Sequence, residues 1–238
     1  MEGIMMTYVM SDMHGEYDKY IAMLEKIHFS DSDKMYILGD VVDRGNKPVE
    51  ILLDMRGRSN VYPIMGNHDK MAIDTLEWLL REVTDETLEQ NLSREKMYKL
   101  AIWRMNGSQT TIDGFARIPK EERQSLLDYM KSFAPYKVVN IAGKTFILVH
   151  AGLGHFSRDK SLDDYSLQDL AFVRFNYSVQ YFGGDVYIIT GHTPTITITY
   201  KAEIYHSCNN ICIDCGAVFP SGRLACLRLD DMKEYYVD

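Results

Sequence analysis

The chain has 238 residues, 46% of them hydrophobic, and a formal net charge of −8. This length suits one large domain or two small ones and can bury a substantial core. The acidic balance argues against a general nucleic-acid binder, which needs a basic surface, and no apolar run approaches the length of a membrane span. The first residues show no basic region or cleavage site, so we expect no signal peptide and a cytoplasmic location.

The first predicted unit is a strand over residues 5–10, a polar loop, and an amphipathic helix over 16–28. In the loop, Asp12 and His14 are two positions apart. In extended backbone their side chains would point to the same side. This spacing would let both side chains reach one metal ion.

The second unit repeats this order, with an apolar strand over 34–38 and a helix over about 48–56 that opens on proline. The loop between them contains Asp40, Asp43 and Arg44. Asp40 has the chemistry of a metal ligand, Asp43 can orient an acid or a base, and Arg44 can hold a phosphate. Open α/β sheets bind ligands at the carboxyl ends of strands, although an isolated Asp-Arg pair is more often an exposed ion pair.

The third unit has a strand over 60–65, the polar residues Asn67 and His68, and a helical stretch over 70–81. Three strand–loop–helix units in succession, each with ligand-type residues in its loop, predict a layered α/β fold.

A helical region without strands follows, at about 84–133. Ser93 is a plausible N-cap for a helix that runs to Met105, and Pro119 opens another helix. No Gly/Ser/Pro-rich linker flanks the region. We therefore expect one domain over residues 1–238, with a helical cap inserted over the site.

The second half of the chain is predicted to form a second sheet packed on the first. Strand-type runs lie at 137–141, 145–149 and 185–190, with a helical stretch near 167–175 between the last two. His150 follows the second run directly, and His192 follows the third. The tail, 195–237, is expected to add strands and turns.

Four cysteines lie in this tail, and three of them are closely spaced. A zinc site is one interpretation, but the second Cys-x2-Cys half that zinc ribbons use is missing. Cys212 and Cys226 lie among strand-like apolar residues, so buried free thiols are the better interpretation.

Oxygen and imidazole donors thus gather in the loops that follow predicted strands: Asp12, His14, Asp40, Asn67, His150 and His192. Donors of this kind suit hard or borderline divalent metals. Four of the seven histidines lie in such loops, which is an improbable distribution for surface residues.

The loop motifs resemble, in chain order, those of the calcineurin-like metallophosphoesterases. They read Ser-Asp-Met-His-Gly, Gly-Asp-Val-Val-Asp-Arg-Gly, Gly-Asn-His-Asp, Val-His-Ala-Gly-Leu and Gly-His-Thr. The chain is similar to the phosphoprotein phosphatase branch, and within it to bacterial and phage serine/threonine phosphatases. The segment 103–111 resembles a cap segment of that subgroup, and 213–218 resembles its closing strands.

The resemblance implies an α-β-β-α sandwich of two mixed sheets flanked by helices, with an inserted helical cap. It also implies a site for two divalent metal ions, with Mn²⁺ preferred and iron, zinc or cobalt compatible. In this assignment Asp12, His14 and Asp40 bind the first ion, and Asp40 bridges to the second. The second ion is completed by Asn67, His150 and His192.

The same resemblance implies direct attack of a metal-bridging hydroxide on a phosphate ester. His68 would act as general acid, and Asp43 would fix its orientation. Arg44 and Asn67 would bind the phosphate together with a second arginine, for which Arg174 is the first candidate and Arg158 the alternative.

The resemblance implies a phosphomonoesterase acting on phosphoserine and phosphothreonine in proteins. The expected partner is a phosphorylated protein, not a nucleic acid or a membrane, and the oligomeric state stays open. One alternative is a symmetrical diadenosine tetraphosphate hydrolase, which has similar motifs. Another is a non-catalytic scaffold of the same fold, although all the catalytic positions are filled.

Overall fold

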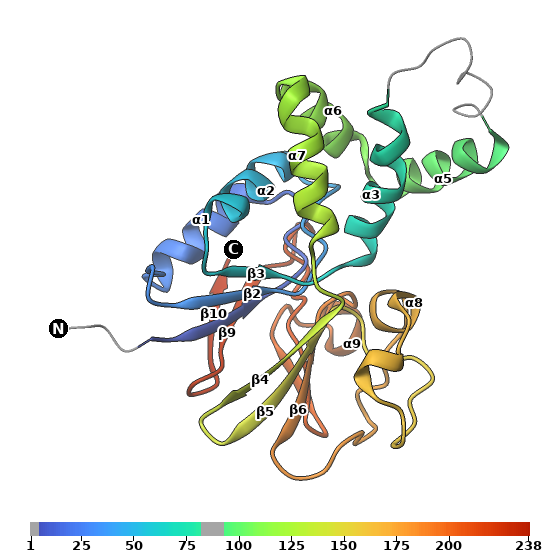
Figure 1. Cartoon of the computed structure of the whole chain (residues 1–238). Helices are drawn as coiled ribbons and strands as arrows, with labels where there is room; N and C mark the ends of the chain where they lie inside the picture. The colour runs from blue at the N-terminus through green and yellow to red at the C-terminus, as the bar shows by residue number, and fades with distance from the viewer. Residues whose placement is uncertain (1–4, 82–92) are drawn as a thin grey trace.

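The computed structural model describes residues 5–81 and 93–238 of the chain. Its strands form two mixed sheets of five strands each, with helices on the outer faces (Figure 1). This arrangement confirms the predicted layered fold. Among the helices in these two stretches, none is both long and apolar enough to span a membrane.

The first sheet has three parallel strands and an antiparallel pair along one edge. In spatial order these are β10 (Lys233–Val237), β9 (Leu224–Arg228), β1 (Thr7–Met10), β2 (Lys34–Ile37) and β3 (Val61–Pro63). Parallel neighbours need crossover connections. Helices α1 (Tyr17–Lys26) and α2 (Pro48–Gly57) provide them, and Pro48 opens α2 as predicted.

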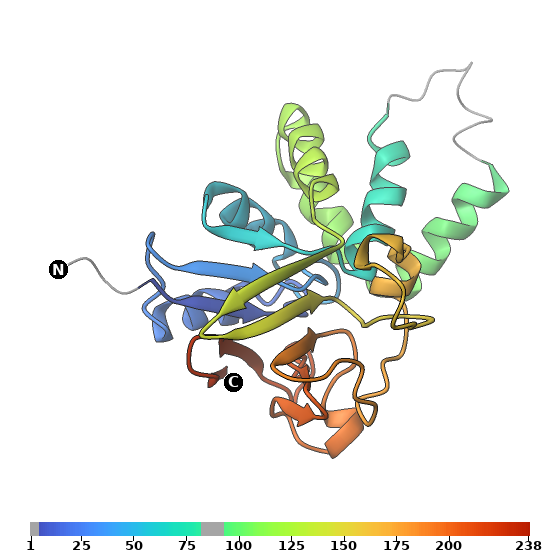
Figure 2. The same cartoon turned by 60° about the horizontal axis from the view of Figure 1, so that its bottom comes forward.

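The second sheet has three parallel strands between two antiparallel edge strands. In spatial order these are β4 (Tyr136–Ile141), β5 (Lys144–Val149), β6 (Val186–Thr190), β8 (Asn210–Cys212) and β7 (Tyr205–Ser207). In Figure 2 the yellow strands β4 and β5 lie in front of the blue strands of the first sheet.

Alternate residues of the central strands face different layers, because side chains along a strand alternate between its two faces. Val9 of β1 packs with Phe146 and Leu148 of β5 in the cluster between the sheets. Its neighbours Tyr8 and Met10 belong to the cluster that the first sheet forms with its helices. Burial on both faces explains why these strands read as continuous apolar runs.

Short helices accompany the second sheet: η1 (Leu162–Asp164), α8 (Leu167–Ala171) and α9 (Ile196–Thr199). The helix predicted near 167–175 is thus shorter than expected. The turn α9 was not predicted, because the tail was expected to hold strands and turns alone. Its first turn is held by the Thr197 hydroxyl, which donates to the carbonyl of Pro194 at 2.7 Å, and Tyr200 ends it in a left-handed conformation.

Four helices project from one end of the sheets in both views (Figures 1 and 2). They are α3 (Asn67–Leu79), α5 (Arg94–Met105), α6 (Gln109–Arg117) and α7 (Lys120–Lys131). The Ser93 side chain caps α5 as predicted, by accepting the N–H of Lys96 at 3.4 Å. Of the predicted insertion at about 84–133, residues 84–92 lie outside the described part of the chain.

Helix α3 begins at Asn67 and not near residue 70 as predicted. The cause is Asp69, whose carboxylate accepts the N–H of Gly66 at 3.1 Å and so completes the first turn. This early start places Asn67 and His68 on the helix instead of in a loop before it.

Candidate metal centre

Left-handed backbone conformations mark the site. A positive φ angle is found at six of the residues predicted to form it: Asp12, His14, Asp40, Asp43, Arg44 and His192. A non-glycine residue in this conformation costs about 1–3 kcal/mol and persists only where the surroundings impose it. The surrounding structure therefore holds these loops in conformations that they would not adopt on their own.

Asp40 lies at the centre of the predicted ligands. It belongs to two groups whose potential ligand atoms all lie within 4.8 Å of one another. One group joins it to His14 and His68, and the other to His150 and His192. Its carboxylate oxygens are 3.7 Å from the Nε2 atom of His14 and 3.4 Å from that of His150. One buried carboxylate thus faces imidazoles from both sheets.

Backbone carbonyls fix the ring orientation of two of these histidines. The Nδ1 atom of His14 donates to the carbonyl of Val42 at 2.9 Å, and that of His150 donates to Leu38 at 2.6 Å. Because a carbonyl only accepts, the proton must lie on Nδ1. Nε2 is then directed at the centre, which is the arrangement that metal-binding histidines typically have.

The amide oxygen of Asn67 joins the same centre. It lies 3.0 Å from the Nε2 atom of His150 and 2.9 Å from the Nδ1 atom of His192. Both ring nitrogens of His150 therefore face acceptors. The oxygens that accept a proton from Nε2 could bind a divalent cation instead. Carboxylate, amide and imidazole donors of this kind suit a hard or borderline metal.

Asp12 connects the first strand to the His192 loop. Its carboxylate accepts the backbone N–H of His192 at 2.9 Å and contacts the Ser11 hydroxyl. Burial raises the pKa of Asp12 to about 7. It lies outside the two groups around Asp40 but lines the same pocket.

The pKa values of the buried histidines differ because their neighbours differ. Burial lowers the pKa of His14 and of His192 to about 3, so both are neutral and can act as ligands. Burial also opposes the charge on His150, but the Asp40 carboxylate beside it outweighs burial and raises the pKa of His150 to about 10. The pKa of Asp40 falls well below its usual range, because His150 and His68 outweigh the effect of burial.

His68 and Asp43 form a buried pair beside the metal ligands. The Nδ1 atom of His68 donates to Asp43 at 2.7 Å, and Asp43 is 0% exposed. The Nε2 atom accepts from the guanidinium of Arg44 at 3.0 Å, because arginine only donates. His68 differs from the other histidines in that side chains engage both of its ring nitrogens.

The site opens into a pocket of about 310 Å³ that contains two arginines, Arg44 and Arg174. The guanidinium of Arg174 donates to the Thr193 hydroxyl at 3.0 Å and approaches the carbonyl of His192 at 3.5 Å. Arg158 is exposed and lies outside this pocket. Of the two candidates for the second arginine, Arg174 is therefore the one that the fold brings to the site.

Two helices of the predicted insertion, α5 and α6, contact the site in ways that the sequence did not indicate. Trp103 of α5 and Thr111 of α6 both donate to Asp43. Asn106, which follows α5, lines the pocket. Nothing in the residue pattern of the segment 103–111 indicates contact with a carboxylate more than 50 positions earlier in the chain.

Asp69 was missed as well. Its carboxylate accepts the N–H of Asp40 at 2.8 Å and of Val41 at 3.1 Å, in addition to that of Gly66. It ties the loop after β2 to the start of α3. Asp214, predicted to be a structural hydrogen-bonding residue, accepts the N–H of Gly216 at 2.9 Å and also lines the pocket.

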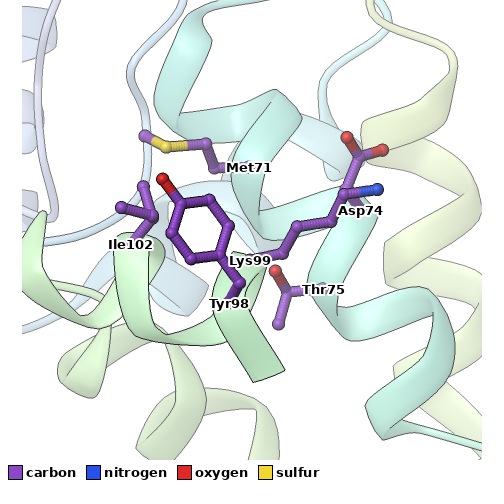
Figure 3. A pocket seen from close by; sticks show the side chains of 6 residues that line it. All are labelled: Met71, Asp74, Thr75, Tyr98, Lys99 and Ile102. Carbon is purple, nitrogen blue, oxygen red and sulfur yellow. The ribbon is translucent and has the colours of Figure 1, made fainter. Parts of the chain in front are cut away.

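A second pocket, of about 150 Å³, lies between α3 and α5 (Figure 3). Figure 3 shows side chains from the two helices facing each other: Met71, Asp74 and Thr75 from α3, and Tyr98, Lys99 and Ile102 from α5. It contains none of the predicted site residues.

Paired imidazole and carboxylate groups, a histidine–aspartate pair and two arginines thus lie together around one pocket. The family profile described as calcineurin-like phosphoesterase matches residues 5–214. The chain belongs to this family. The fold and the donor set fit the divalent, dinuclear metal centre that the family implies.

A symmetrical bis(5′-nucleosyl)-tetraphosphatase of Salmonella typhimurium is 31% identical over 101 residues. The alignment spans 42% of this chain and 36% of the relative. A solved structure provisionally assigned as a diadenosine tetraphosphatase matches with a TM-score of 0.64 and 14% identity, over 99% of this chain and 94% of that one. The cold-active protein-tyrosine phosphatase of a Shewanella species matches with a TM-score of 0.55 and 19% identity, over 99% and 81%. At these identities the two structures show the fold alone.

Proposed function

We propose that the protein hydrolyses phosphoserine and phosphothreonine esters in cytoplasmic proteins, with two divalent cations, preferably Mn²⁺. The observation that carries this proposal is the position of Asp40, whose carboxylate faces His14 on one side and His150 on the other. Arg44 and Arg174 are both exposed on the same pocket, so a phosphorylated side chain on a protein surface could reach them.

The proposed ligands divide into two sets that share Asp40. Asp12 and His14 would hold one cation, and Asn67, His150 and His192 would hold the other. When bound, the two cations would activate water and neutralise the charge that develops on the phosphate. Arg44 and Arg174 would orient the remaining phosphate oxygens by charge-assisted hydrogen bonds, with Asn67 beside them.

His68 is the proposed general acid. Its Nε2 atom accepts from Arg44 at 3.0 Å, so this nitrogen can carry a proton only when the guanidinium turns away. A bound phosphate would draw Arg44 from His68 and leave Nε2 free to protonate the leaving oxygen. Asp43, 2.7 Å from Nδ1, would stabilise the protonated ring. Proton transfer of this kind contributes about 10²–10⁴-fold to the rate.

A second candidate function is hydrolysis of symmetrical diadenosine tetraphosphate. The specific observation in its favour is the 31% identity to the Salmonella tetraphosphatase over 101 residues. It uses the same proposed ligands and the same acid, but the leaving group is a nucleotide.

One assay separates the two functions. Protein loaded with Mn²⁺ is given phosphoserine, phosphothreonine and phosphotyrosine peptides and, in parallel, diadenosine tetraphosphate, with a chelator-treated control. Faster turnover of the phosphoserine and phosphothreonine peptides would support the proposal. Preference for the dinucleotide would assign the second function, and activity that survives complete metal removal would contradict both.

A further inference from the structure

A groove with aromatic walls lies beside the metal pocket. It has a volume of about 430 Å³ and is formed by the segments that follow β5 and α8. Its lining includes Leu153, Phe156, Val173, Phe175 and Tyr181. None of these residues has a role in the proposed hydrolysis.

The aromatic rings of the groove are fixed by one another. Phe175 stacks on Tyr181 with centroids 4.6 Å apart, and Phe156 meets the edge of Tyr181 at 4.9 Å. Phe175 also covers Gly152, where an added Cβ would lie 2.4 Å from the ring. The walls are therefore formed before any ligand binds, which reduces the entropy cost of binding.

Arg174 connects the groove to the metal pocket, because it lines both. Its guanidinium is held on the metal side by the Thr193 hydroxyl. A substrate whose phosphate binds Arg174 would therefore have its neighbouring groups beside the groove.

Two polar side chains that line the groove, Asn176 and His155, each have one atom engaged. The Oδ1 atom of Asn176 accepts the N–H of Ser178 at 3.0 Å, and the Nδ1 atom of His155 is paired with Asp169 at 2.8 Å. A nucleobase has polar edges that need partners, whereas an apolar side chain needs only contact area. Because most of the groove lining is apolar, the groove favours an apolar side chain over a base.

We propose that this groove binds an apolar, preferably aromatic, side chain that neighbours the phosphorylated residue of a protein substrate. The inference rests on the proposed function and specifies its substrate class. It predicts that the flanking sequence of a phosphopeptide, and not the phosphate alone, governs turnover.

The test uses metal-loaded full-length protein and phosphoserine peptides that differ only in phenylalanine or glycine at positions flanking the phosphoserine. p-Nitrophenyl phosphate and diadenosine tetraphosphate are measured in parallel. Tyr181→Ala removes a wall of the groove, and Asn176→Trp fills the groove without removing a ring. Tyr98→Ala on α5 is the control, because Tyr98 is 68% exposed and lines the other pocket.

We expect kcat/KM to favour the phenylalanine peptide by about tenfold or more at one flanking position, as discrimination in apolar pockets does. Both groove variants should bring that ratio close to one and leave p-nitrophenyl phosphate turnover unchanged. Tyr98→Ala should keep the preference.

Other outcomes would overturn the inference. They are equal turnover of both peptides by the wild-type protein, a preference that both groove variants retain, or a preference lost only in Tyr98→Ala. Groove variants that lose activity on diadenosine tetraphosphate alone would assign the groove to a nucleoside. If the wild-type protein cleaves p-nitrophenyl phosphate but no peptide, the proposed function fails, and the inference fails with it.

Discussion

The indole N–H of Trp103 donates to both carboxylate oxygens of Asp43, at 2.9 and 3.1 Å. The hydroxyl of Thr111 adds a second donor at 2.7 Å. Asp43 in turn accepts from His68. Helices α5 and α6, which contain no proposed ligand, thus hold the partner of the proposed acid.

Replacing Trp103 with phenylalanine should slow turnover without loss of metal. The change removes one donor to a buried carboxylate, which typically costs about 1–3 kcal/mol. Asp43 then keeps Thr111 and His68 as side-chain partners, so its orientation toward His68 is less fixed. We expect kcat on an alkyl phosphate to fall by about tenfold, with less effect on p-nitrophenyl phosphate, whose leaving group needs little protonation. Trp78→Phe is the control, because the Trp78 indole N–H is buried and has no hydrogen-bond partner among residues 5–81 and 93–238.

Replacing His68 with asparagine should remove the general acid and leave the proposed ligands in place. We expect turnover of phosphopeptides to fall by about 10²–10⁴-fold, and p-nitrophenyl phosphate to be affected much less. The check is steady-state kinetics on both substrates, with metal content measured by elemental analysis. If the variant loses metal in step with activity, His68 is a ligand and the proposed role is wrong.

The number of bound metal ions should distinguish Asp40, which is proposed to contact both ions, from His14, which is proposed to bind only one. Asp40→Asn weakens both proposed sites, because Asp40 is within 3.7 Å of His14 and 3.4 Å of His150. His14→Ala should release only one of the two ions. Elemental analysis after gel filtration measures both, and Asp33→Asn, a buried aspartate that accepts from Met6, serves as the control. Equal losses in the Asp40 and His14 variants would argue against a shared carboxylate.

Metal binding should release protons and strengthen as pH rises. Without metal, the pKa of His150 is about 10, so the ring carries a proton at pH 7 that a metal ligand must lose. The pKa of Asp12 is about 7, so it releases a further fraction of a proton. Affinity should therefore rise by about 10³-fold between pH 6 and 8, with about tenfold per pH unit from His150 and a further tenfold over the range from Asp12. Calorimetry in buffers of different ionisation enthalpy measures the release, and an affinity that is constant over this range would contradict the protonated state of His150.

Gly39→Ala should destabilise the fold by about 1–3 kcal/mol. Gly39 has a φ of +83°, and an added Cβ would lie 2.4 Å from the backbone nitrogen of Gly66. Gly143→Ala separates the strain of a positive φ from the effect of the close contact. Gly143 has a φ of +77°, and no atom of the described residues lies within 4 Å of the added Cβ. Urea unfolding should give the larger loss for Gly39, and equal losses would mean that the close approach is unimportant.

The residues that meet around Asp40 could be located from sequence because each lies within a few residues of the end of an apolar run. A strand pattern locates Asp12, Asp40 and His150 at strand ends. Parallel pairing of β1 and β2 brings Asp12 and Asp40 to one edge of the first sheet, and His150 reaches them from the second sheet. The layers were predictable for the same reason, since continuous apolar runs indicate strands that are buried on both faces.

Contacts between distant segments were not predictable in this way. The bond from Trp103 to Asp43 depends on how α5 packs, and the choice of Arg174 over Arg158 depends on how the chain folds after α8. The start of α3 was misplaced because the capping carboxylate of Asp69 has no periodic signal. Local patterns thus located the residues, and tertiary packing selected which of them meet.

The proposed ligands come from both sheets, with Asp12, His14 and Asp40 from the first and His150 and His192 from the second. Bound cations would therefore join the two sheets, and their affinity would depend on how the sheets are positioned against each other. A substitution that leaves a cavity in the apolar layer between the sheets, for example at Leu148, would loosen the packing of one sheet on the other. We expect it to lower metal affinity without changing a ligand. In this fold, damage to the packing between the sheets would first appear as a metal deficiency.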